Sequence, residues 1–184
     1  MPVDVKKMIA ETFVEMARHR SVDKITVKDL VEACHISRQT FYYHFQDILE
    51  VIEWSMQREM QRMLEASLQA ERPEEALKVF ASLSEDQERR GMLRRLLDSQ
   101  RRDQISKIIV HAVRTYLQEM FHSKQPGLEL KLSRAEWEVM LDFYAFGLTG
   151  LLLKYCVQEH MDPDVLSHCA YRLLSGELFR SDSI

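Results

Sequence analysis

Apolar residues recur every three to four positions along most of this 184-residue chain, a spacing typical of amphipathic helices. The clearest stripe near the N-terminus follows the positions i, i+3, i+4 and i+7 and consists of Val27, Leu30, Val31 and Cys34. A shorter stripe is formed by Phe41 and Phe45, which lie four residues apart. No stretch shows the period-two alternation that predicts a half-buried strand. The pattern therefore predicts an all-α fold.

Each of these two stripes is preceded by a residue type that commonly begins a helix. Thr26 stands directly before the first stripe and Ser37 shortly before the second. A side-chain oxygen at this N-cap position accepts a hydrogen bond from a backbone N–H group that has no partner inside the helix. Residues 26–45 are therefore predicted to form two short helices joined by a tight turn. This is the helix-turn-helix arrangement, whose second helix enters the major groove of DNA.

Similar signals divide the rest of the chain into further helices. One helix is expected from about Val3 to Arg20, and the helix from Ser133 is expected to run to about Glu159. The clearest loop is Ser123 to Gly127. Three helices would form a helix-turn-helix head of residues 1–47, and about six, making about nine in all, would form a bundle of residues 48–184 for effector binding and dimerisation. The helices of this bundle are expected to begin at or near Asp47, Pro73, Ser84, Arg101, Ser133 and Asp162.

Polar residues fill the first turn of the predicted recognition helix, the part that meets base edges. Arg38 can bond bidentately to guanine, Gln39 can do the same to adenine, and the methyl group of Thr40 can pack against that of thymine. The plain alternative is that three polar residues simply follow a helix cap. The next turn carries side chains that either contact nucleic acid or are partly buried aromatics: Tyr42, Tyr43 and His44.

Two groups of residues in this region match the pattern of a known family. They are Thr26-Val27-x-Asp29-Leu30 and Ile36-Ser37-x-x-Thr40-Phe41-Tyr42-Tyr43-His44-Phe45. Together they resemble the N-terminal domain of the TetR family of transcriptional regulators, and the Tyr-Tyr-His-Phe end is the specific part. The resemblance implies a homodimer that binds a palindromic double-stranded DNA operator, most often as a repressor, with tyrosine and histidine donating to backbone phosphates. The implied DNA-binding residues are Thr26, Ser37, Arg38, Gln39, Thr40, Tyr42, Tyr43 and His44.

The chain departs from the family pattern at two places. His35 stands where the turn normally carries glycine, and a non-glycine residue in a left-handed conformation costs about 1–2 kcal/mol. Either the turn differs slightly or this cost is borne. Family members also often place lysine just after the final phenylalanine, whereas this chain has Gln46 and Asp47. One ionic phosphate contact is therefore missing, and we expect a shallower salt dependence of DNA binding.

A weaker similarity near the C-terminus concerns control of the regulator. Phe143 to Leu151, followed by Met161-Asp162-Pro163, is similar to the branch of the family that includes the activator of bacterial dihydroxyacetone kinase. That branch implies a protein co-regulator docking on the body. For most relatives the effector would instead be a small apolar molecule. We favour this alternative because methionine side chains suit an adaptable pocket. The default interpretation of these methionines is plain core packing. The residues expected near such a pocket are Met60, Met92, Tyr116 and Phe121.

The last two long helices are expected to form the two-fold dimer interface. The helices that begin near Ser133 and Asp162 carry more apolar surface than packing on one core requires. Gly147 and Gly150 allow two helices to cross closely, and glycine in the middle of a helix is destabilising unless packing compensates. We therefore expect Gly147, Gly150 and Leu151 to lie in the interface between two copies of the chain.

The charge of the chain favours a second reading of its function. The net charge is −4, and residues 1–50 contain seven Lys and Arg against eight Asp and Glu, which gives −1. A strong non-specific DNA binder would be more basic. The alternative is a helical protein-interaction adaptor that keeps the TetR-like fold without specific DNA binding.

Other classes of function find no support in the sequence. There is no nucleophile–base motif, no glycine-rich phosphate loop and no metal-ligand spacing, so neither an enzyme nor a cofactor or metal site is expected. The 3 cysteines include no CxxC pair, which favours reduced thiols in the cytoplasm. The longest apolar run, Phe143 to Leu153, is too short to span a membrane, and the N-terminus does not resemble a signal peptide.

Overall fold

The computed structural model describes residues 4–82, 86–124, 131–154 and 162–174. Within these ranges the chain forms nine α-helices, a short 3₁₀ helix and no strand, which confirms the predicted all-α fold. The α-helices are α1 (Val5–His19), α2 (Val27–Ala33), α3 (Arg38–His44), α4 (Ile48–Gln69), α5 (Pro73–Ala81), α6 (Gln87–Leu97), α7 (Arg102–Lys124), α9 (Arg134–Leu151) and α10 (Pro163–Leu174), and the 3₁₀ helix is η1 (Val22–Lys24).

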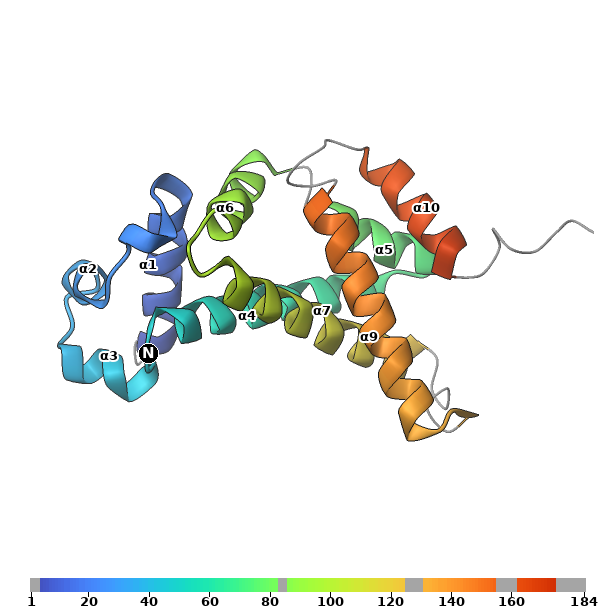
Figure 1. Ribbon diagram of the computed structural model, residues 1–184, viewed down its shortest axis with the longest axis horizontal. Helices are drawn as coiled ribbons and strands as arrows, with labels where there is room; N and C mark the ends of the chain where they lie inside the picture. Colours follow the sequence, from blue (N-terminus) through green and yellow to red (C-terminus); the bar gives the residue numbers. More distant parts are fainter. Residues whose placement is uncertain (1–3, 83–85, 125–130, 155–161, 175–184) are drawn as a thin grey trace, which may run out of the picture.

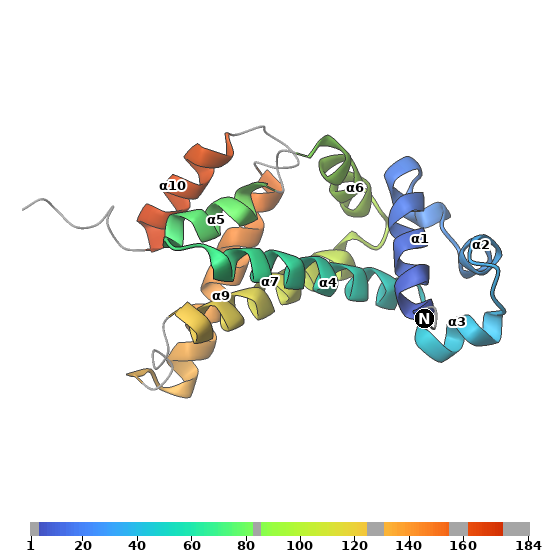
Figure 2. The same ribbon diagram turned by 180° about the vertical axis from the view of Figure 1, so that it is seen from behind.

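The helices form a small head and a larger body that are joined by α4 (Figure 1). α1, α2 and α3 pack together at one end, and α4 runs from the end of α3 into the body, where it lies against α7. Seen from behind, α9, α10 and α5 form the far end, with α10 packed on α5 (Figure 2). α6 lies between the two parts and contacts both α1 and α7.

Most helices begin at the residues that the sequence predicts, because a side chain caps the first turn. Thr26 and Asp29 form a reciprocal capping box at the start of α2, and Ser133 and Glu136 form another at the start of α9. Asp47 accepts a hydrogen bond from the backbone of Glu50 at 3.0 Å and so begins α4. The starts of α5 at Pro73 and α10 at Pro163 also agree with the prediction.

Two predicted boundaries differ from the structure. The start expected at Ser84, which lies outside the described residues, is replaced by Asp86, whose carboxylate accepts from two backbone N–H groups in the first turn of α6. Ser123 was expected in a loop but belongs to α7. α7 extends to Lys124 because that ammonium group donates to two carbonyls at the end of α4, at 2.8 and 2.7 Å.

The remaining predicted boundary concerns α9. The α-helical part of α9 ends at Leu151, and residues 152–154 continue it as a π-helical turn. The end expected near Glu159 lies outside the described residues, as do residues 125–127 of the expected loop.

The head is held together by large apolar side chains that are almost fully buried. They come from all three of its helices, and each is at most 2% exposed: Ile9, Phe13, Leu30, Phe41 and Phe45. The predicted stripes therefore face one shared core. Because Phe41 and Phe45 lie on the same side of α3, the opposite side of that helix is turned toward solvent.

The turn between α2 and α3 keeps the left-handed conformation despite the lack of glycine. His35 has a φ of 53°. It ends α2 in a Schellman motif, in which His35 N–H donates to the Glu32 carbonyl at 3.2 Å and Ile36 N–H donates to the Val31 carbonyl at 3.0 Å. The turn thus has the geometry that glycine usually provides, and the protein tolerates the cost in stability of a side chain at this φ.

We predict that His35→Gly stabilises the protein. Glycine removes the left-handed strain, and part of that gain is offset by the greater freedom of glycine in the unfolded chain. The expected net increase in the free energy of unfolding is about 0.5–1 kcal/mol, measured by urea denaturation. His35→Ala is the control and should bring no such gain. A glycine variant that is less stable than the unmodified chain would contradict this account of the turn.

Candidate nucleic-acid interface

The orientation of α3 is fixed by its two buried phenylalanines and its N-terminal cap. Ser37 Oγ accepts a hydrogen bond from Thr40 N–H at 3.0 Å and begins the helix. The Phe41 and Phe45 rings lie 6.1 Å apart, and Phe45 meets the Trp54 ring of α4 edge-on at 6.2 Å. α3 is therefore anchored both to the head core and to the first turns of α4.

The opposite side of α3 presents a row of donors to solvent. Tyr43 is 85% exposed and Tyr42 is 57% exposed. Arg38 and Gln39 are also exposed, and within the described ranges their side chains form no hydrogen bond or ion pair. A guanidinium group, an amide and two phenol hydroxyls are thus available on one short helix. These are the groups that bond to base edges and phosphate oxygens.

The two half-buried members of the predicted set lie at the ends of this row. Thr40 sits in the first turn, where its hydroxyl is 2.8 Å from Ser37 Oγ. His44 closes the helix, and its ring packs edge-on against Tyr43 with the ring centroids 5.1 Å apart. The structure therefore brings Ser37, Arg38, Gln39, Thr40, Tyr42, Tyr43 and His44 together on α3.

Thr26 lies apart from α3, at the start of α2. Its hydroxyl donates to an Asp29 carboxylate oxygen at 2.6 Å and accepts from Asp29 N–H at 3.2 Å. The hydrogen bond from the Thr26 hydroxyl, together with that from the Thr26 backbone N–H, holds the pKa of the Asp29 carboxyl below its ordinary value. Both Thr26 and Ser37 thus cap helices, and a DNA contact by either stays a prediction.

Lys6 is a basic residue beside the recognition helix that the sequence pattern does not single out. Its ammonium nitrogen lies 5.1 Å from the Phe45 ring centroid and 5.9 Å from that of Trp54. It therefore brings a cation to Phe45 at the C-terminal end of α3, one residue before the position at which family members often carry lysine. Spacing along the chain cannot reveal this contact, because it joins two distant segments.

Only part of the expected effector pocket lines a cavity. A cavity of about 360 Å³ lies between the head and the body, and Met60 and Met92 are among its lining residues. Tyr116 and Phe121 do not line it. The Tyr116 hydroxyl is buried and lies 2.8 Å from Ser67 Oγ, and burial raises its pKa. Phe121 packs against the rings of two residues of α9, Trp137 and Tyr144.

The residues expected at a dimer interface lie on an open face of α9. Gly147 and Gly150 are exposed, and within the described residues no non-adjacent atom lies within 4 Å of the position that a Cβ would take. Leu151 is half-buried. Large apolar side chains are also exposed elsewhere on α9 and α10: Val139, Phe143, Phe146, Val165 and Leu173.

The helices of the body have no membrane-spanning character. None in the described ranges combines the length and the apolar composition needed to cross a bilayer.

The head matches a known family. Residues 9–53 fit the model of the bacterial regulatory proteins of the tetR family. Among curated proteins, the HTH-type dhaKLM operon transcriptional activator DhaS of Lactococcus lactis subsp. lactis (strain IL1403) is 29% identical over 59 residues. The matched stretch covers 32% of this chain and 32% of that relative, so less than two thirds of the relative's length is represented.

Solved structures share the fold along nearly the whole chain. The Dihydroxyacetone kinase operon activator DhaS has a TM-score of 0.64 at 15% identity, covering 96% of this chain and 97% of its own. Lin0861 from Listeria innocua gives 0.68 at 20% identity, with 98% and 96% covered. The fatty acid degradation regulator FadR from Bacillus halodurans gives 0.57 at 16% identity, with 98% and 100% covered. At these identities the likeness shows a common fold, and the model that residues 9–53 match describes bacterial regulatory proteins.

Proposed function

We propose that this chain, whose head is a TetR-family regulatory domain, is a sequence-specific DNA-binding regulator that acts as a homodimer on a palindromic operator. The observation that carries the proposal is the outward row of donors on α3, with Tyr43 85% exposed opposite two buried phenylalanines. Repression is the mode that the family resemblance favours. Activation is the mode named for DhaS, and a reporter gene placed behind the operator distinguishes the two.

We expect residues at the two ends of α3 to make different kinds of contact with DNA. Arg38 and Gln39 lie in the first turn of α3, which meets base edges in helix-turn-helix proteins. Tyr43 and His44 lie in the last turn, where donors reach the backbone without reading sequence.

We predict two different losses when these side chains are changed. Arg38→Ala and Gln39→Ala should each lose about 1–3 kcal/mol of discrimination at one position of each half-site, because a bidentate base contact is removed. Tyr43→Phe and His44→Ala should weaken binding to all sequences by a similar factor. The measurement is fluorescence anisotropy on the operator and on its single-base variants. Unchanged affinity in all four variants would remove α3 from the interface.

Lys6 offers a phosphate contact that compensates for the lysine missing after Phe45. Its ammonium group lies at the same end of α3, held over the Phe45 ring. A single cation matters here, because residues 1–50 have a net charge of only −1 and phosphate contacts supply most of the sequence-independent affinity.

We predict that Lys6→Gln lowers the affinity for every duplex and reduces the slope of log K against log salt by about 1.8 per bound dimer, the value for one phosphate contact from each of the two copies. Lys7→Gln is the matched control, since Lys7 pairs with Glu11 at 3.8 Å and lies on the next face of α1. Gln46→Lys in the Lys6→Gln background should restore the slope. A slope that stays constant in Lys6→Gln would show that this cation does not meet DNA.

Dimerisation would place two copies of α3 in register with the DNA. The exposed side of α9 combines Phe143 and Phe146, 73% and 64% exposed, with two glycines that leave the backbone open. Apolar faces of this kind are uncommon on monomers, and the glycines suit a close crossing of two copies of α9. The two heads would then address half-sites about one helical turn apart, roughly 34–36 Å.

We predict that Gly147→Leu combined with Gly150→Leu dissociates the dimer while the chain stays folded. A Cβ at either position meets nothing within 4 Å and both positions are exposed, and leucine favours helix over glycine by roughly 1 kcal/mol, so the fold should not suffer. Sedimentation velocity should show a dimer before and a monomer after the substitutions, with unchanged circular dichroism. A dimer that persists after the two substitutions, or an unmodified chain that is monomeric at micromolar concentration, would contradict this interface.

The alternative of a helical adaptor is favoured by the nearly neutral head. Residues 1–50 have a net charge of −1. A head that contacted only proteins would have no need for the exposed, unpaired side chains of Arg38, Gln39 and Tyr43. An adaptor would bind all duplexes equally weakly or not at all, so the substitutions in α3 could not reduce any preference among DNA sequences.

A further inference from the structure

The turn between α2 and α3 contains a strained backbone position. Within residues 4–82, 86–124, 131–154 and 162–174, His35 is the only residue other than glycine with a positive φ, at 53°. A side chain in this conformation costs about 1–2 kcal/mol. Strained positions of this kind concentrate at functional sites, where the side chain does what glycine could not do. The imidazole of His35 is therefore a candidate functional group.

The turn itself does not use this imidazole. Two hydrogen bonds close the turn, from His35 N–H to the Glu32 carbonyl and from Ile36 N–H to the Val31 carbonyl, and both join main-chain atoms. Glycine would form the same bonds without strain. The side chain of His35 thus adds nothing to the geometry of the turn.

The imidazole of His35 also has no partner in the part of the chain that the structure describes. It is exposed and forms no hydrogen bond, ion pair or ring contact there. The other two histidines of the head differ in this respect. His19 Nε2 lies 3.1 Å from Glu15 Oε1, and the ring of His44 packs on that of Tyr43. His35 therefore presents an uncommitted donor to solvent.

His35 stands at the border of the candidate nucleic-acid interface. The turn lies at the end of the head that is farthest from the body (Figure 1). Ile36, the next residue, packs against the core, and three exposed residues follow it: Ser37, Arg38 and Gln39. The imidazole therefore borders the first turn of α3, the part that meets base edges in helix-turn-helix proteins.

The two carboxylates of α2, the helix that ends at this turn, are already paired. Glu32 pairs with Lys28 at 3.8 Å. Asp29 pairs with Arg20 of the segment after α1 at 3.6 Å and also caps α2. Neither carboxylate is free to bind the imidazole of His35, so an anionic partner would come from another molecule.

The other neighbours of the turn are neutral or positive. α1 meets the turn at Thr12, whose hydroxyl accepts from the Cys34 thiol at 3.3 Å. The first charged side chain of α3 is Arg38, which is exposed and forms no ion pair with the described residues. A cation and an imidazole without partners thus stand three residues apart, a combination suited to an anion.

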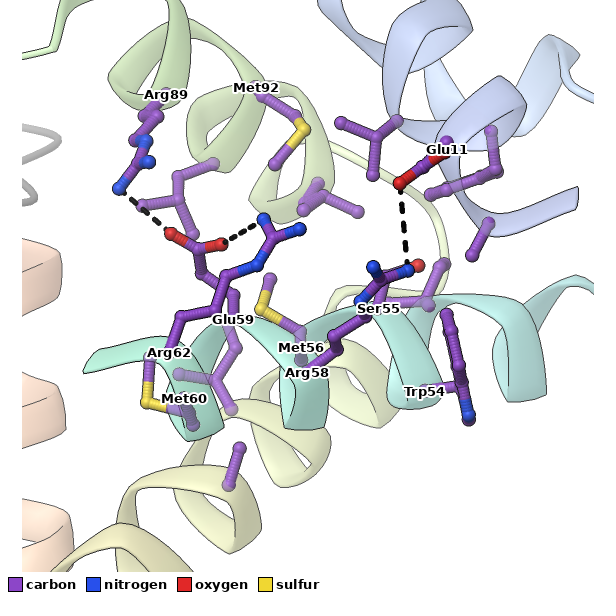
Figure 3. A pocket seen from close by; sticks show the side chains of 18 of the residues that line it. Glu11, Trp54, Ser55, Met56, Arg58, Glu59, Met60, Arg62, Arg89 and Met92 are labelled. Carbon is purple, nitrogen blue, oxygen red and sulfur yellow. Dashed lines mark hydrogen bonds and ion pairs between the residues drawn. The ribbon is translucent and has the colours of Figure 1, made fainter. Parts of the chain in front are cut away.

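The side of the head that faces the body has the opposite character, because its charges are paired across helices. Glu11 of α1 pairs with Arg58 of α4 at 3.6 Å (Figure 3). Arg18 of α1 pairs with Glu88 of α6 at 3.7 Å. Uncommitted donors are therefore found at the α2–α3 turn and along α3, where an external anion can reach them.

We propose that His35 is a further DNA contact, in which its imidazole donates to a backbone phosphate at the edge of each half-site. The inference rests on the proposed function and adds one residue to its interface. A phosphate is the partner, rather than a base, because His35 precedes the recognition helix whose first turn enters the groove. The strained φ is then the cost of placing a donor where glycine has none.

Such a contact strengthens as the pH falls. A neutral imidazole has one N–H donor, whereas the protonated ring has two donors and a positive charge. Histidine ordinarily gains this proton below about pH 6.5, and a neighbouring phosphate favours the protonated form. The contribution of His35 to DNA affinity should therefore be large at about pH 6 and small at about pH 8.5.

The test is fluorescence anisotropy of the full-length protein on its operator at about pH 6 and about pH 8.5. His35→Gly should bind about tenfold more weakly per copy at the lower pH, and about threefold more weakly or less at the higher pH. At the lower pH alone it should also reduce the slope of log K against log salt by about 1.8 per bound dimer. Because the same variant is expected to be more stable, unfolding would not explain the loss.

Two further variants separate a DNA contact from a role in the turn. His35→Asn tolerates the left-handed conformation but gains no proton, so it should lose the pH-dependent part of the affinity as His35→Gly does. His19→Gln changes the paired histidine of α1 and should leave affinity and salt slope unchanged at both pH values. His44 is present in every variant, so its own titration is common to all of them.

The outcomes distinguish this contact from the proposed function. Affinity and salt slope that are unchanged in His35→Gly at the lower pH would overturn the contact alone. A loss of equal size at both pH values, with a constant slope, would overturn the phosphate as its partner. A folded chain that binds no duplex at either pH would fail the proposed function, and the contact with it.

Discussion

The burial of Phe41 and Phe45 is the constraint on which the candidate interface depends. The two rings are 0% and 1% exposed, and burial of each side chain contributes about 1.5–3 kcal/mol. Turning α3 to bury another face would expose both rings and bury Arg38 or Tyr43 without partners, so one orientation prevails. The polar side of α3 faces solvent as the necessary counterpart of this packing.

The same packing connects the recognition helix to the rest of the molecule. Phe45 meets Trp54 on α4, and Trp54 lies 5.3 Å below the Arg58 guanidinium, which also pairs with Glu11 of α1. A change in the tilt of α4 is therefore transmitted to the end of α3. α6 makes a second connection, because the Arg95 guanidinium donates to the Ala17 carbonyl of α1 at 2.8 Å.

Features set by local chemistry could be predicted from the sequence. A cap acts within one helical turn, which is why Thr26, Asp47 and Ser133 indicated the starts of α2, α4 and α9 correctly. At His35 the sequence left two possibilities open, a slightly different turn or a left-handed residue, and the structure has the left-handed conformation. In the candidate site, the residues of α3 could be placed together because they share a short segment with a clear apolar face.

Features that depend on contacts between distant segments could not be predicted in this way. α7 continues through Lys124 because carbonyls of α4 accept from that side chain. Lys6 reaches α3 only through the packing of α1, and the cavity takes a wall from the head that no methionine pattern indicates. For the same reason, Tyr116 and Phe121 suited a pocket by composition but are occupied by partners elsewhere in the body.

The central claim is that the outward face of α3 reads a defined DNA sequence twice, once in each of two copies of the chain. Selection of random-sequence duplexes by the full-length protein, followed by sequencing of the retained pool, tests it most directly. The account predicts enrichment of a palindrome whose half-sites are centred about one helical turn apart, roughly 10 base pairs. A retained pool with no enriched sequence, from a folded and dimeric protein, would contradict it.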